Sequence, residues 1–376
     1  MTFRLTRMSR TLVAIFVAAT TAAACAAPAA QSGAPADAVA ATGLLYVCNQ
    51  DDATVSIIDM ATNRVVRTVD LQQLGFSANA KPHHVAVEPD GSYWYVTLIG
   101  DGRIVKLDSR DRMVGQVPFE TPGMLALHPT QDLLLVGRSM TAVNPPQRIG
   151  VLRRSDMMLN ELPVFFPRPH ALAIEPRSGI AYTASLAVNQ MAAVDPAQEE
   201  VELLDVPGPA HALMQFAVSP DGRTLVVSSE LSHKVFIFDI SSPMAPRITG
   251  EIDVGPQPFD PIFTPDGRYV YLGNKAANTV TVIDMSSRTV AEVITGRGLA
   301  QPHGVAVSPD GRFVYISNNN TGQVHDMSAG HEAHAAAATT PGRGTVVVID
   351  TATRDIISVI EVGRNASGIG TRTPAR

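Results

Sequence analysis

Histidine is the residue with the widest chemical use in this sequence, which contains ten of them. Three histidines directly follow a proline, and each of these pairs opens a short apolar segment: His83, His170 and His303. Three more side chains that can bind a metal or transfer a proton lie close to the start of such a segment: His84, His211 and Asp260. Neutral imidazole is the commonest side-chain ligand of transition metals and also a frequent general base.

A second group of such side chains lies in one long segment, 318–344, among alanines and other small residues. It contains His325, Met327, His331 and His334. Imidazole suits zinc and copper, and the presence of a thioether beside it favours copper. The two groups together predict a copper or zinc site.

The elements that must position these residues repeat along the chain. Segments such as VAVEPDG and VAVSPDG each end a short alternating strand in a proline turn, and successive turn prolines are separated by 40, 47, 44, 45 and 44 residues: Pro89, Pro129, Pro176, Pro220, Pro265 and Pro309. The residues that end the third strand of each unit form a second series. This series gives seven units, one more than the prolines: Asp59, Asp108, Arg153, Asp195, Asp239, Asp284 and Asp350. Four short strands per 40–45 residues indicate the blades of a β-propeller.

The seventh inner strand is missing from the first unit, 43–70, and an unpaired strand-like segment stands at 365–372. We expect the C-terminal segment to complete the first unit, which would close the ring and cover its exposed sheet edges. The predicted fold is all-β: a seven-bladed β-propeller with four-stranded blades over 43–376.

The repeats resemble those of the YVTN-repeat propellers, which are related to the cytochrome d1 propellers and the propeller lactonases. The resemblance covers roughly residues 43–372 and rests on the repeated PDG turns and on three copies of the name-giving tetrapeptide: Tyr46-Val47-Cys48-Asn49, Tyr271-Leu272-Gly273-Asn274 and Tyr315-Ile316-Ser317-Asn318. It implies the fold. It does not imply one activity, because this scaffold carries many functions.

With blades assigned, each histidine has a predicted place. Six residues before each turn proline, the inner strand begins at the top face: His83, Gly123, His170, Met214, Phe259 and His303, with Ser367 in the closing strand. The loops between second and third strands emerge on the same face, and they carry His233 and the 318–344 segment. Nine of the ten histidines are therefore expected at the top, and His128, in a bottom turn, is the exception.

Other interpretations of the top face stay open. A histidine could act as acid or base in an enzyme of the propeller lactonase or lyase kind, with Asp260 or Glu332 as its carboxylate partner. The face could bind an anionic ligand, a tetrapyrrole held without covalent bonds, or a protein of the cell envelope. Each histidine by itself is equally compatible with capping a strand through a backbone carbonyl.

The N-terminus predicts export. Arg4, Arg7 and Arg10 precede a short apolar run and then small residues, the order of a secretory signal at 1–24. The sequence Ala22-Ala23-Ala24-Cys25 predicts lipidation at Cys25, with ordinary signal cleavage in the same alanine stretch as the alternative. Residues 25–42 would then form a flexible tether, and the protein would lie in the bacterial periplasm or cell envelope.

The composition and the absence of certain motifs exclude several classes of function. Loss of the signal removes three arginines and no acid, which takes the net charge from −6 to −9 and argues against nucleic-acid binding. Motifs for a serine nucleophile elbow, a phosphate loop, a dinucleotide site or a covalent c-type haem are absent from the sequence. We expect a monomeric binding protein rather than an enzyme, attached to the membrane only through lipid, with a small ligand or metal and, as a further candidate, an envelope protein as partners.

Overall fold

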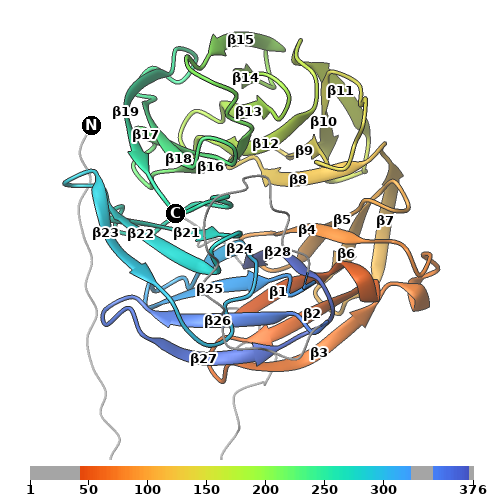
Figure 1. The fold of residues 1–376 in the computed structure, drawn as a ribbon. Coiled ribbons are helices and arrows are strands. Elements are labelled where there is room, and N and C mark those ends of the chain that lie inside the picture. Colours follow the sequence, from red (N-terminus) through yellow and green to blue (C-terminus); the bar gives the residue numbers. More distant parts are fainter. Residues whose placement is uncertain (1–42, 323–341, 372–376) are drawn as a thin grey trace, which may run out of the picture. The chain divides into compact units, whose positions relative to one another are not determined.

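The computed structural model describes residues 43–322 and 342–371. Seven four-stranded antiparallel sheets form a ring (Figure 1), so the predicted propeller fold is confirmed. The inner strands pack against one another in the order β28, β4, β8, β12, β16, β20, β24 and back to β28. In the described part of the chain, no helix is long and apolar enough to cross a membrane.

Each blade consists of four strands. Blade one contains β28 (Ala366–Thr371), β1 (Leu44–Asn49), β2 (Thr54–Asp59) and β3 (Arg64–Asp70). Blade two contains β4 (Pro82–Val87), β5 (Tyr93–Leu98), β6 (Arg103–Asp108) and β7 (Met113–Pro118). Blade three contains β8 (Pro122–Leu127), β9 (Leu133–Arg138), β10 (Arg148–Arg153) and β11 (Leu159–Pro163). Blade four contains β12 (Pro169–Ile174), β13 (Ala181–Ser185), β14 (Gln190–Asp195) and β15 (Glu200–Asp205).

The remaining blades have the same order from axis to rim. Blade five contains β16 (Leu213–Val218), β17 (Thr224–Ser229), β18 (Lys234–Asp239) and β19 (Arg247–Asp253). Blade six contains β20 (Ile262–Phe263), β21 (Tyr269–Asn274), β22 (Thr279–Asp284) and β23 (Thr289–Ile294). Blade seven contains β24 (Pro302–Val307), β25 (Phe313–Asn318), β26 (Thr345–Asp350) and β27 (Ile356–Glu361). Two short 3-10 helices, η1 (Gln50–Asp52) and η2 (Gln72–Leu74), lie in top loops of the first blade.

The ring closes as the sequence predicts. The C-terminal strand β28 pairs antiparallel with β1, with Leu45 opposite Thr371 and Asn49 opposite Ala366. At the top of this seam, Arg364 donates from Nε to the carboxylate of Asp52 at 2.5 Å. The first and last strands of the described chain therefore share one blade, and the N-terminal end of β1 and the C-terminal end of β28 both lie at the bottom face.

Hydrophobic burial holds neighbouring blades together. The second and third strands of each blade are almost fully buried, as in β1 and β2, whereas the outermost strands such as β3 are largely exposed. Aromatic rings cross between blades, as where Tyr46 of blade one lies 5.1 Å from Trp94 of blade two, centroid to centroid. Cys48, in the same interface, has no exposed surface, and burial raises the pKa of its thiol, so it is the inert cysteine that an apolar strand predicts.

The bottom turns explain the repeated proline–aspartate–glycine sequences. In blade seven, the Ser308 hydroxyl donates to the Asp310 carboxylate at 2.6 Å and accepts the backbone N–H of Phe313 at 2.9 Å. Gly311 has φ of +73°, a conformation that favours glycine. These short-range bonds satisfy the hairpin backbone locally, as predicted for turn-forming residues.

One top-face feature recurs in all seven blades. The residue just before each inner strand, or before its bridge residue in blade six, has a left-handed backbone although it is not glycine: Lys81, Thr121, Arg168, Ala212, Gln257, Gln301 and Asn365. Its carbonyl accepts the N–H of the residue that follows the second strand of the same blade. Left-handed L-residues cost about 1–2 kcal/mol each, so these bonds fix a conformation that the local chain would not choose.

This turn sets two rings of side chains around the mouth of the central channel. The first ring is the second residue after the left-handed one: His83, Gly123, His170, Met214, Phe259, His303 and Ser367. The second ring follows the second strands: Gln50, Ile99, Ser139, Leu186, Glu230, Lys275 and Asn319. The first ring is the set that counting back from the turn prolines predicted.

The closing strand should tolerate no added volume. A Cβ at Gly368 would lie inside the contact radius of the His83 carbonyl oxygen and 2.8 Å from the His84 Cα. We expect Gly368→Ala to lower the free energy of unfolding by about 1–3 kcal/mol, because the seam backbone must shift. Gly250→Ala is the matched control, since its Cβ would meet nothing nearer than 3.9 Å. Urea unfolding compares the two variants, and equal loss would contradict this account of the seam.

Candidate functional site

Three imidazoles from three blades meet at the channel mouth. His83, His170 and His303 are buried, with 3%, 4% and 7% of their surface exposed. The ring centroid of His83 lies 6.3 Å from that of His170 and 6.0 Å from that of His303. We call these three residues the histidine cluster. The structure thus brings together the three proline-preceded histidines of the sequence.

Hydrogen bonds fix the tautomer of one member of the histidine cluster. Nδ1 of His170 lies 2.8 Å from the backbone carbonyl oxygen of Arg138, which can only accept, so Nδ1 carries the hydrogen. In the neutral ring, Nε2 of His170 then presents a lone pair. Such outer bonding to a carbonyl is how proteins orient an imidazole for metal binding or proton transfer.

The other two members have ring nitrogens without protein partners. Nε2 of His83 and Nδ1 of His303 are buried and make no hydrogen bond among the described residues. Leaving a buried polar atom unpaired costs about 1–3 kcal/mol, so two such atoms in adjacent rings indicate a place where another group completes the bonding.

The orientation of the Gln50 amide determines whether Nε2 of His83 is a hydrogen-bond donor or an acceptor. The amide nitrogen lies 3.2 Å from Nδ1 of His83, and in that arrangement Nε2 carries the hydrogen and is a donor. If the amide turns so that its oxygen faces the ring, Nδ1 carries the hydrogen and Nε2 offers a lone pair. Gln50 belongs to the second ring, which the sequence analysis did not consider.

Burial keeps the histidine cluster neutral. Desolvation, with smaller contributions from neighbouring charges such as Lys275, lowers the pKa of His83 and His303 well below 6.5. Desolvation likewise lowers the pKa of His170 to about 4. Because the charged form is disfavoured, all three rings are available as ligands or hydrogen-bond partners at neutral pH.

His84 links blades two and three. Its Nδ1 accepts the backbone N–H of Leu125 in blade three at 3.2 Å, so this nitrogen joins two blades. Burial lowers the pKa of His84 to about 4. The ring is therefore neutral as well, with one nitrogen already occupied.

Lys275 and Asp260 bring two ionisable groups with perturbed pKa values to the mouth. The Nζ of Lys275 lies 4.7 Å from the ring centroid of Phe259, and that ring lies 5.0 Å from the ring of His303. Desolvation raises the pKa of Asp260 to about 7, against the opposing charge of Lys275. Desolvation lowers the pKa of Lys275. Perturbed pairs of this kind concentrate at functional sites.

Lys275 and Gln50 are site residues that the sequence predictions above do not include, although the sequence carries a signal for both. Each is the residue immediately after the asparagine that ends a tetrapeptide repeat, at Asn49 and Asn274. Aligning the repeats at that asparagine would have placed both residues at the channel mouth.

Two predicted ligands are engaged elsewhere. Nδ1 of His211 lies 2.9 Å from the Ser232 hydroxyl, and its Nε2 lies 3.0 Å from the Pro207 carbonyl. Nδ1 of His233 accepts the backbone N–H of Gln257 at 3.3 Å. Both histidines fix top loops of blade five through these bonds. His128 caps a bottom turn, as expected, by accepting two backbone N–H groups.

The remaining predicted ligands, His325, Met327, His331 and His334, and the lipidation site Cys25, lie outside the described residues. Over 43–322 and 342–371, no three His, Cys, Asp or Glu side chains already enclose a position for a metal ion. A metal in the histidine cluster would therefore require rotation of the rings toward one another.

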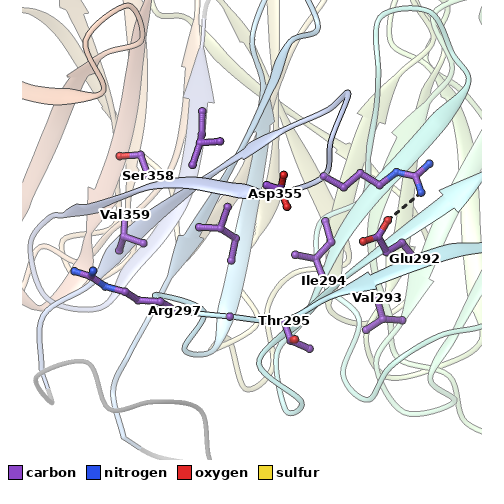
Figure 2. Close-up of a pocket in the computed structure, with 12 residues that line it drawn as sticks. Glu292, Val293, Ile294, Thr295, Arg297, Asp355, Ser358 and Val359 are labelled. Carbon is purple, nitrogen blue, oxygen red and sulfur yellow. Dashed lines mark hydrogen bonds and ion pairs between the residues drawn. The ribbon is translucent and has the colours of Figure 1, made fainter.

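A separate pocket lies at the rim, between the outer strands of blades six and seven (Figure 2). Its volume is about 590 Å³, and it is lined by β23 and β27 together with the segments beside them. Its Glu292 is paired with Arg354 at 3.0 Å. It contains none of the predicted site residues, so the candidate site is the channel mouth.

Comparison with known proteins gives distant relatives. No family model matches the chain. It is 24% identical over 292 residues to a 6-phosphogluconolactonase of Yersinia pestis (strain Pestoides F), covering 69% of this chain and 82% of that protein. The corresponding enzyme of Yersinia enterocolitica is 23% identical over 294 residues, covering 69% and 83%.

Solved structures share the fold. A functionally unknown protein from Desulfotomaculum acetoxidans superposes with a TM-score of 0.67 at 14% identity, covering 89% of this chain and 100% of that one. A streptogramin B lyase gives 0.62 at 16% identity, covering 73% and 86%. The dihydro-heme d1 dehydrogenase NirN gives 0.58 at 16%, covering 88% and 75%. The chain is thus a seven-bladed propeller with distant sequence similarity to 6-phosphogluconolactonases.

Neutral buried imidazoles make stability depend on pH. The pKa of His170 is about 4 in the fold against 6.5 for the free side chain, so the unfolded chain binds its proton more readily. Stability is therefore full above about pH 6.5 and falls as the pH drops toward 4. We expect roughly 2 kcal/mol of loss per such histidine between pH 7 and pH 5. Urea unfolding at both pH values should show this loss reduced in His170→Asn, whereas an unchanged pH dependence would contradict the burial of a neutral His170.

Proposed function

We propose that this protein binds a transition-metal ion, copper or zinc, at the histidine cluster. The observation that carries the proposal is the pair of buried, unpartnered imidazole nitrogens, on His83 and His303, beside the oriented Nε2 of His170. Neutral imidazole is the form that binds such metals, and burial maintains it. Rings from three blades would supply the ligands. The Arg138 carbonyl would orient His170, and Gln50 would orient His83 with its amide oxygen turned toward Nδ1, so that Nε2 of His83 offers a lone pair.

We further propose that the protein is exported and held at the cell envelope through a lipid on Cys25, and that it belongs with the YVTN-repeat propellers. The signal-like N-terminus and the three tetrapeptide repeats support this. The N-terminal end of β1 and the C-terminal end of β28 lie at the bottom face, opposite the histidine cluster. An anchor at the N-terminal end would therefore leave the channel mouth accessible to ligand.

Removal of two cluster rings should abolish metal binding. The mature protein, dialysed against copper or zinc and then against buffer, should retain close to one equivalent by elemental analysis. His83→Ala combined with His303→Ala should weaken binding by at least about 100-fold, since two of three ligands are lost. His128→Asn, at the bottom face, is the control and should bind as the wild type does.

Two results would contradict this proposal. One is a wild-type protein that takes up neither metal. The other is a double variant that binds normally and loses binding only when His325, Met327, His331 and His334 are replaced, which would assign the metal to the 318–344 segment instead.

A second candidate function is hydrolysis or elimination on a lactone-like substrate. The carboxyl group of Asp260, with a pKa of about 7, favours it, because a general acid or base works best when its pKa lies near the working pH. The 6-phosphogluconolactonase and streptogramin B lyase relatives support the same class of chemistry at a propeller. In this candidate Asp260, rather than a histidine, would move the proton.

Asp260→Asn tests the second candidate. Acid release from a panel of sugar lactones, followed in a pH-stat, should rise as the pH increases through about 7, because the base acts in its ionised form. The variant should lose about 10²-fold or more of that rate. Asp253→Asn, at a side chain that is 86% exposed, is the matched control. Equal activity of the Asp260 variant and wild type, or no activity on any lactone, would exclude this candidate.

A further inference from the structure

The pocket at the rim between blades six and seven is lined by charged side chains that differ in their partners (Figure 2). Glu292 and Arg354 pair with each other at 3.0 Å, and the Arg354 guanidinium also lies 5.0 Å from the centroid of the Tyr269 ring. Arg297 and Asp355 line the same pocket, and neither makes an ion pair within 4.0 Å with any described residue. Within the described chain, the pocket therefore contains one cation and one anion without a charged partner.

A tight turn fixes the position of Arg297. Gly298 has φ of +91°, and the N–H of Leu299 donates to the Gly296 carbonyl at 3.4 Å, so these residues form a turn with Arg297 at its corner. The Thr345 hydroxyl of blade seven donates to the Gly298 carbonyl at 2.7 Å. The turn follows the last strand of blade six and is thus attached to blade seven across the pocket.

The same turn lies against β27. A Cβ at Gly298 would lie 2.7 Å from Cγ1 of Val359, and a Cβ at the glycine before Arg297 would lie 3.0 Å from Cδ1 of Ile356. The turn therefore follows β27 from 356 to 359. This places Arg297 about two residues beyond Asp355 along the strand, a separation of roughly 7 Å. Figure 2 shows the two side chains apart in the same pocket.

The wall between the two charges combines apolar and hydroxyl side chains: Ile294, Thr295, Ile356, Ser358 and Val359. The pocket volume of about 590 Å³ lies within the range of small-ligand sites. Such a wall suits a ligand that has an aliphatic side chain and hydrogen-bonding groups between two opposite charges.

We propose that the rim pocket binds a peptide of two or three residues with free termini. The terminal carboxylate would accept from the guanidinium of Arg297, whose planar N–H donors match a carboxylate. The terminal ammonium would donate to Asp355. An extended chain advances by at most about 3.3–3.6 Å per residue, so the termini of such a peptide can span the roughly 7 Å between the two side chains. An aliphatic side chain of the peptide would contact Ile356 and Val359.

This proposal does not depend on metal binding. None of His83, His170 and His303 lines the rim pocket. A protein without metal affinity could therefore still bind the peptide, and a metal-binding protein could fail to do so.

Calorimetric titration with terminally modified peptides tests the proposal. The probes are alanyl-leucine and alanyl-alanyl-leucine, each also prepared with an acetylated N-terminus or an amidated C-terminus. Arg297→Gln should weaken binding of the free peptides about tenfold and leave binding of the amides unchanged, because the amides lack the carboxylate. Asp355→Asn should weaken binding of the free peptides by a similar factor and leave binding of the acetylated forms unchanged.

A matched control is Arg148→Gln, an exposed arginine of blade three that does not line the pocket, and it should bind as the wild type does. Both pocket variants should keep the thermal midpoint of the wild type, since the replaced side chains are exposed and make no ion pair with described residues. The proposal is overturned if neither free peptide shows saturable binding. It is also overturned if Arg297→Gln weakens the amides as much as the free peptides, because the carboxylate then plays no part.

Discussion

Closure of the ring by β28 is the interaction on which the rest of this structure depends. It joins residues more than 300 positions apart, Asn49 and Ala366, in one sheet and turns seven separate blades into a circle around one axis. The contact between His303 and His83 crosses this closing blade, since they belong to blades seven and two. Small residues at the seam, Ser367 and Gly368, allow the flanking inner strands to approach closely enough for that contact.

Desolvation dominates the chemistry of the channel mouth. It holds the histidine cluster neutral, raises the pKa of Asp260 to about 7 and lowers that of Lys275. In water, the histidines and Lys275 would take up a proton more readily, and Asp260 would lose its proton more readily. Together at the channel mouth, these groups provide neutral imidazole nitrogens and a carboxyl group whose pKa lies near neutral pH. Metal sites and acid–base sites both use groups of this kind.

Proteins with different chemistry share the architecture of this chain. A lactonase resembles this chain in sequence, and a lyase and a dihydro-heme d1 dehydrogenase share its fold, so the fold by itself does not determine a function. In this chain the residues of the two rings determine which chemistry the channel mouth offers. The repeated left-handed turn fixes the position of each of these side chains but does not restrict its residue type. Three of the seven first-ring residues of this chain are histidines, and its second ring contains Lys275.

The sequence alone determined the blades, the closing strand and the first ring, because short-range turn chemistry repeats at a fixed spacing and strand direction then gives each residue a face. It identified His83, His170 and His303 in this way. Tertiary structure alone decided which of them meet, that His211 and His233 are occupied by loop contacts, and that Gln50 contacts His83 while Lys275 contacts Phe259. These outcomes rest on distances between blades and on the loss of water around each group, and neither is encoded in the local pattern.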